Sequence, residues 1–152
     1  KKGGESWGRK GVVVRQGDVV DLDAPLSLPA AYYNNGDSYH YREADKLTRA
    51  MSPMFLGGLT ARAMTLKHAL KSLTFHEIYP AFFQSEIVQS VHYKVDIHLF
   101  IAELHRKERF VLAQQPQNWH QVDALIALLI GTRHQENRHQ EIGNPAEGII
   151  II

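Results

Sequence analysis

The spacing of apolar and polar residues changes along the chain, from short β-branched runs near the start to helical spacing in most of the rest. Two valine runs, at residues 12–14 and 19–20, flank Gln16 and Gly17, a dipeptide that suits a tight turn. Because β-branched residues on both sides of such a turn favour paired strands, the pattern predicts a β-hairpin over residues 11–22.

Helices are predicted over most of the chain after this hairpin. A short charged helix is expected at residues 43–51, and Ser52 followed by Pro53 is typical of a helix N-terminus. Thr60 is expected to cap another helix, which ends near Ser72.

The longest predicted helix runs from about Ser85 to Arg109, because apolar residues recur there along two faces. A helix that is apolar on two sides is normally central in its domain, so we place it in the core. Asn118 is expected to cap a last helix that runs to about Arg138. The core residues expected from these two helices are Val95, Leu99, Ala102, Leu125, Leu128 and Leu129.

The last four residues are isoleucines, Ile149 to Ile152, which predict a buried strand. Because an unpaired strand of this kind is prone to aggregation, we expect it to pair with the hairpin, with a strand of a partner or a second copy, or with sequence outside this chain. The expected fold is α+β: a mainly helical single domain over residues 11–152 with a small antiparallel sheet, made by the N-terminal hairpin and the C-terminal strand. Residues 1–10 are expected to form a flexible arm.

Length and composition narrow the class of protein. The 152 residues suit one domain, and the absence of cysteine excludes a disulfide framework, a thiolate metal site and a cysteine nucleophile. It also fits a reducing compartment, so we expect a cytoplasmic protein. No apolar run approaches the roughly 20 residues of a membrane helix, and no secretory signal is recognisable. The chain does not begin with methionine, which fits a processed product or a segment of a longer protein.

One motif near the end carries a family resemblance. From Leu125 an apolar helix leads into Gly, Thr and Arg, then two other residues and Glu136. This segment resembles the first catalytic box of tyrosine recombinases, the phage-integrase family. The resemblance implies DNA binding, with Arg133 gripping the scissile phosphate and Glu136 as its structural partner. It covers only about residues 118–152, and the tyrosine nucleophile and other later parts of the family's active site have no counterpart here.

Basic residues are concentrated in the first half of the chain. Residues 1–76 carry 11 Lys or Arg against 7 Asp or Glu, whereas residues 77–152 carry 6 against 9. A basic surface on two short helices is able to follow a phosphate backbone, so we expect duplex DNA as a partner. The candidate DNA-binding residues are Arg42, Lys46, Arg49, Arg62, Lys67 and Lys71.

Two alternatives belong to other functional classes. The first is a metal-dependent enzyme, because the chain has nine histidines and His134, His139 and Glu141 lie close together in sequence. These three residues approach one another only if the last helix ends between the two histidines. The second is a non-catalytic interaction or assembly module that adds the strand Ile149 to Ile152 to a partner's sheet. No cofactor is predicted under the DNA-binding interpretation.

A further acidic motif follows the second valine run. Asp21, Leu22 and Asp23 are similar to the aspartate pair of phosphatases of the haloacid dehalogenase family. Two departures weigh against this similarity. Pro25 stands where that motif has Thr or Val, and the region is predicted to be a hairpin instead of the first strand of a parallel sheet. We therefore assign no role to these aspartates from sequence.

Overall fold

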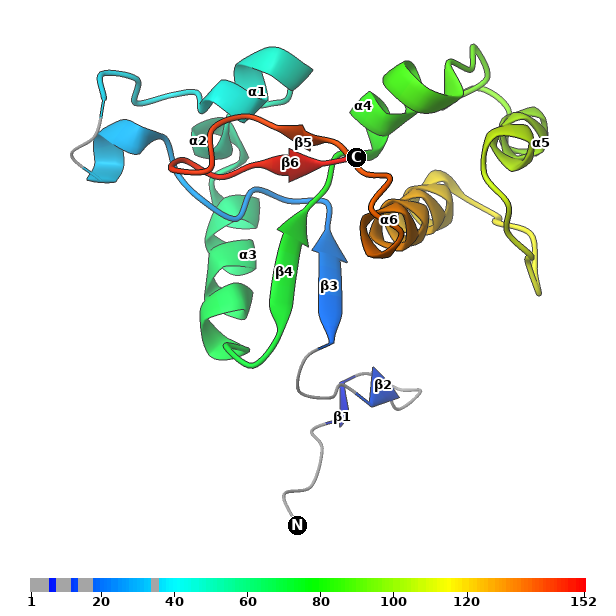
Figure 1. Cartoon of the computed structure of the whole chain (residues 1–152), viewed down its shortest axis with the longest axis horizontal. Helices are drawn as coiled ribbons and strands as arrows, with labels where there is room; N and C mark the ends of the chain where they lie inside the picture. Colours follow the sequence, from blue (N-terminus) through cyan, green and yellow to red (C-terminus); the bar gives the residue numbers. More distant parts are fainter. Residues whose placement is uncertain (1–5, 8–11, 14–17, 34–35) are drawn as a thin grey trace.

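The computed structural model describes residues 6–7, 12–13, 18–33 and 36–152 (Figure 1). The helices are, in chain order, the 3₁₀ turn η1 (Ala30–Tyr33), α1 (Glu43–Thr48), α2 (Pro53–Leu56), α3 (Gly58–Ala69), α4 (Pro80–Phe83), the π-helical turn η2 (Gln84–Val88), α5 (Ile97–Lys107) and α6 (Trp119–Gln135). The strands are β1 (Ser6–Trp7), β2 (Val12–Val13), β3 (Val19–Leu22), β4 (Thr74–Glu77), β5 (Glu141–Ile142) and β6 (Ile150–Ile151). The fold is thus mainly helical α+β, as the sequence predicted.

The predicted hairpin over residues 11–22 is wrong in its pairing. Strand β2 pairs antiparallel with β1, whereas β3 pairs parallel with β4, with Val19 opposite Thr74 and Leu22 opposite Glu77. A parallel pair requires a crossover connection, and α1 to α3 supply it between β3 and β4 (Figure 1). The predicted turn at residues 16–17 and most of the predicted arm lie outside the described residues.

The C-terminal strand is buried within its own chain, which contradicts its use as a docking strand. Strand β6 pairs antiparallel with β5, and Ile151 also forms a parallel bridge with Ile78. Ile150 and Ile152 are 2% and 0% exposed. Ile151 therefore already has two strand partners within its own chain.

The core is organised around α6, which passes beside β3 (Figure 1). Asn118 caps this helix as predicted, because its side chain accepts a hydrogen bond from the Gln121 N–H at 3.0 Å. The helix ends at Gln135. The fully buried side chains of the core include Phe83, Phe100, Leu104, Val122, Ile126 and Ile130.

The single long helix expected over residues 85–109 is broken. Its first turn is η2, and Gln89 and Lys94 adopt left-handed backbone angles before Asp96 caps α5. On α5 only one of the two apolar faces is buried, through Phe100, Ile101 and Leu104. Leu125 and Leu129 are in the core as predicted, but four other expected core residues are exposed: Val95, Leu99, Ala102 and Leu128.

No helix among the described residues is long and apolar enough to cross a membrane.

Candidate functional site

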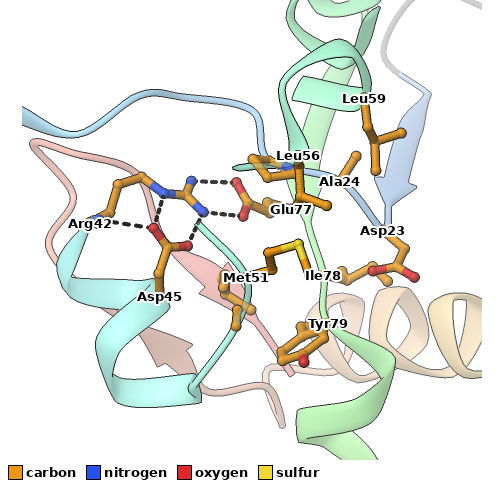
Figure 2. Close-up of a pocket in the computed structure, with 13 residues that line it drawn as sticks. Asp23, Ala24, Arg42, Asp45, Met51, Leu56, Leu59, Glu77, Ile78 and Tyr79 are labelled. Carbon is orange, nitrogen blue, oxygen red and sulfur yellow. Dashed lines mark hydrogen bonds and ion pairs between the residues drawn. The ribbon is translucent and has the colours of Figure 1, made fainter. Parts of the chain in front are cut away.

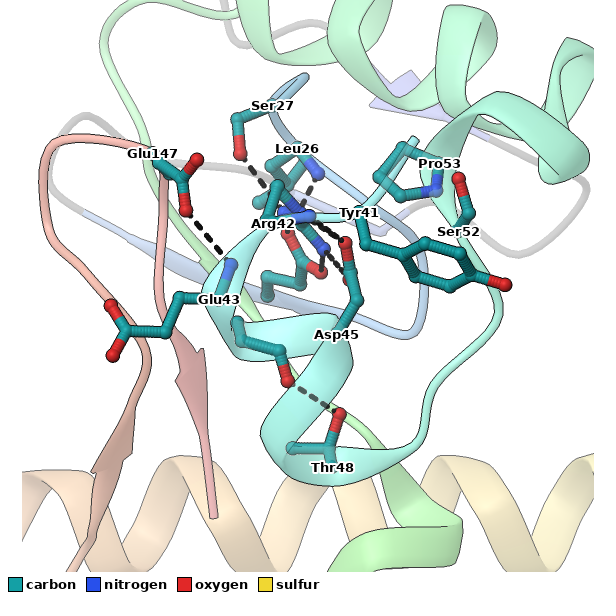
Figure 3. A network of polar contacts seen from close by, with 12 residues as sticks. Leu26, Ser27, Tyr41, Arg42, Glu43, Asp45, Thr48, Ser52, Pro53 and Glu147 are labelled. Carbon is teal, nitrogen blue, oxygen red and sulfur yellow. Dashed lines mark hydrogen bonds and ion pairs between the residues drawn. The ribbon is translucent and has the colours of Figure 1, made fainter. Parts of the chain in front are cut away.

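A buried charge network joins α1 to the end of β4. The guanidinium of Arg42 donates to both oxygens of Glu77, at 2.6 and 2.7 Å, and to both oxygens of Asp45, at 2.6 and 3.1 Å (Figures 2 and 3). Asp45 also accepts the Arg42 N–H at 2.9 Å, which caps α1. The same guanidinium also donates a hydrogen bond to the hydroxyl oxygen of Ser27 at 2.9 Å (Figure 3). All charges of this network therefore have partners inside the protein.

This network removes Arg42 from the predicted DNA-binding set. Arg42 is 0% exposed, so its guanidinium does not reach an external phosphate. Burial alone would lower its pKa, but the hydrogen bonds to Glu77 and Asp45 outweigh that effect and raise the pKa above its usual value. The Arg–Asp pair three positions apart was a sequence signal for this local role, while Glu77 was not identifiable from sequence.

A mostly apolar cavity of about 240 Å³ lies next to the network (Figure 2). Ile78 and Tyr79, which follow β4, line it together with Asp23, and Arg42 and Glu77 are at one side. The facing apolar wall comes from the segment around α2 and consists of Met51, Leu56 and Leu59.

A second, more open cavity of about 430 Å³ lies between the end of β3 and α6. It is lined by three carboxylates and one histidine, Asp21, Asp23, Asp123 and His120, with Ala124, Ala127 and Leu128 beside them. Asp23 lines both cavities.

Among these carboxylates, Asp23 differs from the others in its contacts. Asp123 accepts hydrogen bonds from the Tyr93 hydroxyl at 2.7 Å and from the Lys94 ammonium at 2.6 Å. Asp21 is 3.2 Å from Nδ1 of His76. Asp23 accepts no hydrogen bond from any described residue.

This environment favours the neutral form of Asp23. The residue as a whole is exposed, but its carboxyl group is partly buried. This burial and the nearby charge of Asp123 raise the pKa of Asp23 to about 6. Burial and the hydrogen bond to Asp123 raise the pKa of Tyr93 in turn, which keeps its hydroxyl a proton donor. A carboxyl group with a pKa near neutrality suits proton transfer.

The location of Asp23 also fits a ligand site. It follows β3, and the carboxyl ends of parallel strands are where open α/β sheets usually bind ligands. The parallel pairing of β3 with β4 removes one of the two objections to a role for Asp21 and Asp23, and Pro25 remains the other.

Asp21 packs directly over Gly131 of α6, because a Cβ at position 131 would overlap the Asp21 carboxylate. Gly131 thus has a packing role that the resemblance of this segment to tyrosine recombinases did not predict.

The other five predicted DNA-binding residues are exposed. Lys46 lies on α1 and Arg49 follows it, Arg62 and Lys67 lie on α3, and Lys71 follows α3. The intervening sequence strengthens the prediction, because residues 46–76 contain these five cations and no Asp or Glu. We call these five side chains the basic surface.

The two residues of the recombinase-like box have other partners than expected. Arg133 forms an ion pair with Glu108, donates to the Arg138 carbonyl at 2.9 Å and is only 12% exposed in its side chain. Glu136 pairs with Arg138 at 2.6 Å instead of supporting Arg133. The guanidinium that the resemblance assigns to a phosphate is therefore engaged within the protein.

The histidines of the metal alternative do come together. The ring centroid of His134 is 4.3 Å from that of His139 and 4.2 Å from that of His76, and Oε1 of Glu141 is 3.6 Å from Nε2 of His139. Burial and the two neighbouring rings lower the pKa of His134, which opposes a positive charge on the central ring. In the part of the chain that the structure describes, no three His, Asp or Glu side chains have an arrangement that could hold a metal ion. The metal alternative therefore gains no support from the proximity of these three histidines.

Comparison with models of known protein families, with curated proteins and with solved structures gave no match.

Proposed function

We propose that this protein binds nucleic acid through the basic surface. The observation that carries the proposal is the run of residues 46–76, in which five exposed cations are accompanied by no carboxylate. Such a run gives residues 46–76 a formal charge of +5, with histidines neutral, even though the net charge of the whole chain is only +1. The resemblance to tyrosine recombinases favours DNA as the polymer, and the absence of cysteine favours the cytoplasm.

The binding mechanism follows from charge. Each Lys or Arg that contacts a phosphate releases condensed counterions, so affinity falls linearly with salt on logarithmic axes, by roughly 0.9 per phosphate for duplex DNA. Because the basic surface holds five cations, three to five contacts are expected, with micromolar affinity at low salt and little binding at about 0.3 M salt.

Fluorescence anisotropy of a labelled oligonucleotide tests the proposal directly. The full chain is titrated into the oligonucleotide at salt concentrations from about 50 mM to about 300 mM, the range over which phosphate contacts are lost. The proposal predicts saturable binding with a negative salt slope. Absence of binding at the lowest salt concentration would contradict it.

Asp23 supports a second candidate function, an acid–base enzyme. A carboxyl group that accepts no hydrogen bond from the described residues, has a pKa of about 6 and lines two cavities is suited to protonate a leaving group. Asp123, which accepts hydrogen bonds from Tyr93 and Lys94, lines the second cavity together with Asp23. The apolar cavity shares a wall with the segment that carries the basic surface, so a bound phosphodiester is the substrate to test first.

A cleavage assay separates this candidate from simple binding. The second candidate predicts that the wild-type protein cleaves labelled single or double strands, and that Asp23→Asn loses at least about ten-fold in rate while its affinity is kept. A wild-type protein that binds without cleaving across pH 5 to 8 would leave only the binding function.

A further inference from the structure

Several aromatic side chains are exposed in the carboxylate-free run 46–76 and in the segment that precedes it. Four of them are about half exposed or more: Tyr32 at 45%, Tyr33 at 52%, Tyr39 at 55% and Phe55 at 65%. Single exposed aromatics are ordinary on protein surfaces, but exposed rings in contact with one another are characteristic of a binding site. We call these four side chains, together with Tyr41, the aromatic patch.

Two ring pairs order four of the five members of the aromatic patch. Tyr32 and Tyr39 meet edge to face with their ring centroids 5.6 Å apart. Tyr41 meets Phe55 in the same way at 6.1 Å, and the ring of His40 stacks on Phe55 at 6.1 Å. These contacts hold the rings in place while leaving much of their surface open.

A buried serine attaches the patch to α2. The hydroxyl of Ser52 donates to the carbonyl of His40, and its oxygen also accepts the Met54 N–H at 3.1 Å as the cap of α2. Ser52 is 0% exposed. The loop that carries Tyr39 and Tyr41 is therefore tied to the helix that carries Phe55, and Figure 3 shows the Tyr41 ring beside Ser52 and Pro53.

Charge selects the kind of partner that fits this surface. Phe55 lies within the carboxylate-free run 46–76, with Arg49 before it and Arg62 after it in sequence, both exposed. Two carboxylates, Asp37 and Glu43, are exposed in and after the tyrosine-bearing loop, and the backbone N–H of Glu43 is bonded to Glu147. In the sequence around Phe55, from residue 46 to residue 76, every Lys, Arg, Asp or Glu position is therefore a cation.

We infer that the nucleic acid bound here is single-stranded, with its bases stacked on the aromatic patch and its phosphates on the basic surface. This inference rests on the proposed nucleic-acid binding and specifies its substrate. Unpaired bases stack on aromatic rings whatever their sequence, whereas a duplex keeps its bases stacked inside and offers mainly its phosphates to such a surface. Exposed rings next to cations are the combination that a single strand uses.

The experiment compares a labelled 12-nucleotide single strand with the same strand annealed to its complement. The inference predicts that the wild-type chain binds the single strand at least about five-fold more tightly. Phe55→Ala is expected to weaken single-strand binding by about 5- to 100-fold, the range that stacking of one base covers, and duplex binding by less than two-fold. Its salt slope is expected to stay unchanged, because no cation is lost.

Controls keep each outcome decisive. Phe55→Trp retains a stacking ring and should restore tight binding, while Val95→Ala removes an apolar side chain that is 76% exposed and lies outside the patch. If Phe55→Ala does not fold, Tyr39→Ala is measured in its place. Equal affinity for the single strand and the duplex overturns the inference while the proposed function stands. Unchanged affinities in Phe55→Ala do the same, and they are the result expected if the patch binds protein. No binding of either form at about 50 mM salt overturns the proposed function itself.

Discussion

Arg42 and Glu77 form a doubly hydrogen-bonded ion pair, at 2.6 and 2.7 Å, that is almost completely closed to solvent. The two residues are 35 positions apart, and their pairing fixes the N-terminus of α1 against the end of β4. Glu77 also accepts the backbone N–H of Leu26 at 2.8 Å, which holds the segment after β3 in place. This pair thereby positions the segments that carry Asp23, Tyr79 and Met51.

Removal of the guanidinium is expected to be costly. Arg42→Ala leaves the carboxylates of Glu77 and Asp45 buried without a counter-charge, which typically lowers the free energy of unfolding by about 3–5 kcal/mol. Arg62→Ala, which removes an exposed arginine from α3, should change it by less than about 0.5 kcal/mol. Urea unfolding followed by circular dichroism measures both variants. Equal stabilities would show that the buried network is not structurally important.

Two neighbouring residues of α6 test the corrected core. Ile126→Ala removes a fully buried side chain and should lower the free energy of unfolding by about 2–5 kcal/mol. Leu128→Ala removes a side chain that is 65% exposed, and an effect below about 0.5 kcal/mol is expected. Thermal melting distinguishes the two, and a larger loss in Leu128→Ala would mean that α6 faces the core with its other side.

The raised pKa of Asp23 gives stability a specific dependence on pH. Below its unfolded value of about 3.8 the carboxyl group is neutral in both states, but as pH rises toward 6 only the unfolded state loses the proton. Asp23 therefore lowers the free energy of unfolding. This loss develops between about pH 4 and pH 6 and persists at higher pH. Asp23→Asn should melt at a higher temperature than the wild type at pH 8, with a gain that disappears near pH 4. A gain independent of pH would contradict this assignment.

Local sequence signals predicted local features of the fold well. Ser52-Pro53 and Asn118 mark helix starts because capping depends on side chains within a few residues of the helix end. The general class, mainly helical α+β, follows from the same local periodicities. Lys46, Arg49 and Arg62 are exposed as expected for charged residues on short helices.

Features that depend on distant residues were not predictable from one sequence. The valine run at 19–20 indicates a strand, but nothing near it identifies Thr74 to Glu77 as its parallel partner. Arg42 reads as a surface cation until Glu77 is placed beside it, and Asp23 becomes distinctive only when α6 brings Asp123 close. The apolar stripe containing Val95 and Leu99 predicted the buried face of one long helix. The break before α5 was not predictable, because residues 89–96 contain no proline or glycine.

The most direct test of the nucleic-acid-binding account compares two triple variants that lose the same charge at different places. One replaces Arg62, Lys67 and Lys71 of the basic surface by Gln. The other replaces by Gln Arg106, Lys107 and Arg109, which are also exposed and lie at the end of α5 and just beyond it. For a labelled single strand, the first variant should reduce the salt slope by about 2, at roughly 0.7 per phosphate contact, and the second by less than about 0.5. Equal reductions in the two variants, or no reduction in either, would contradict binding through the basic surface.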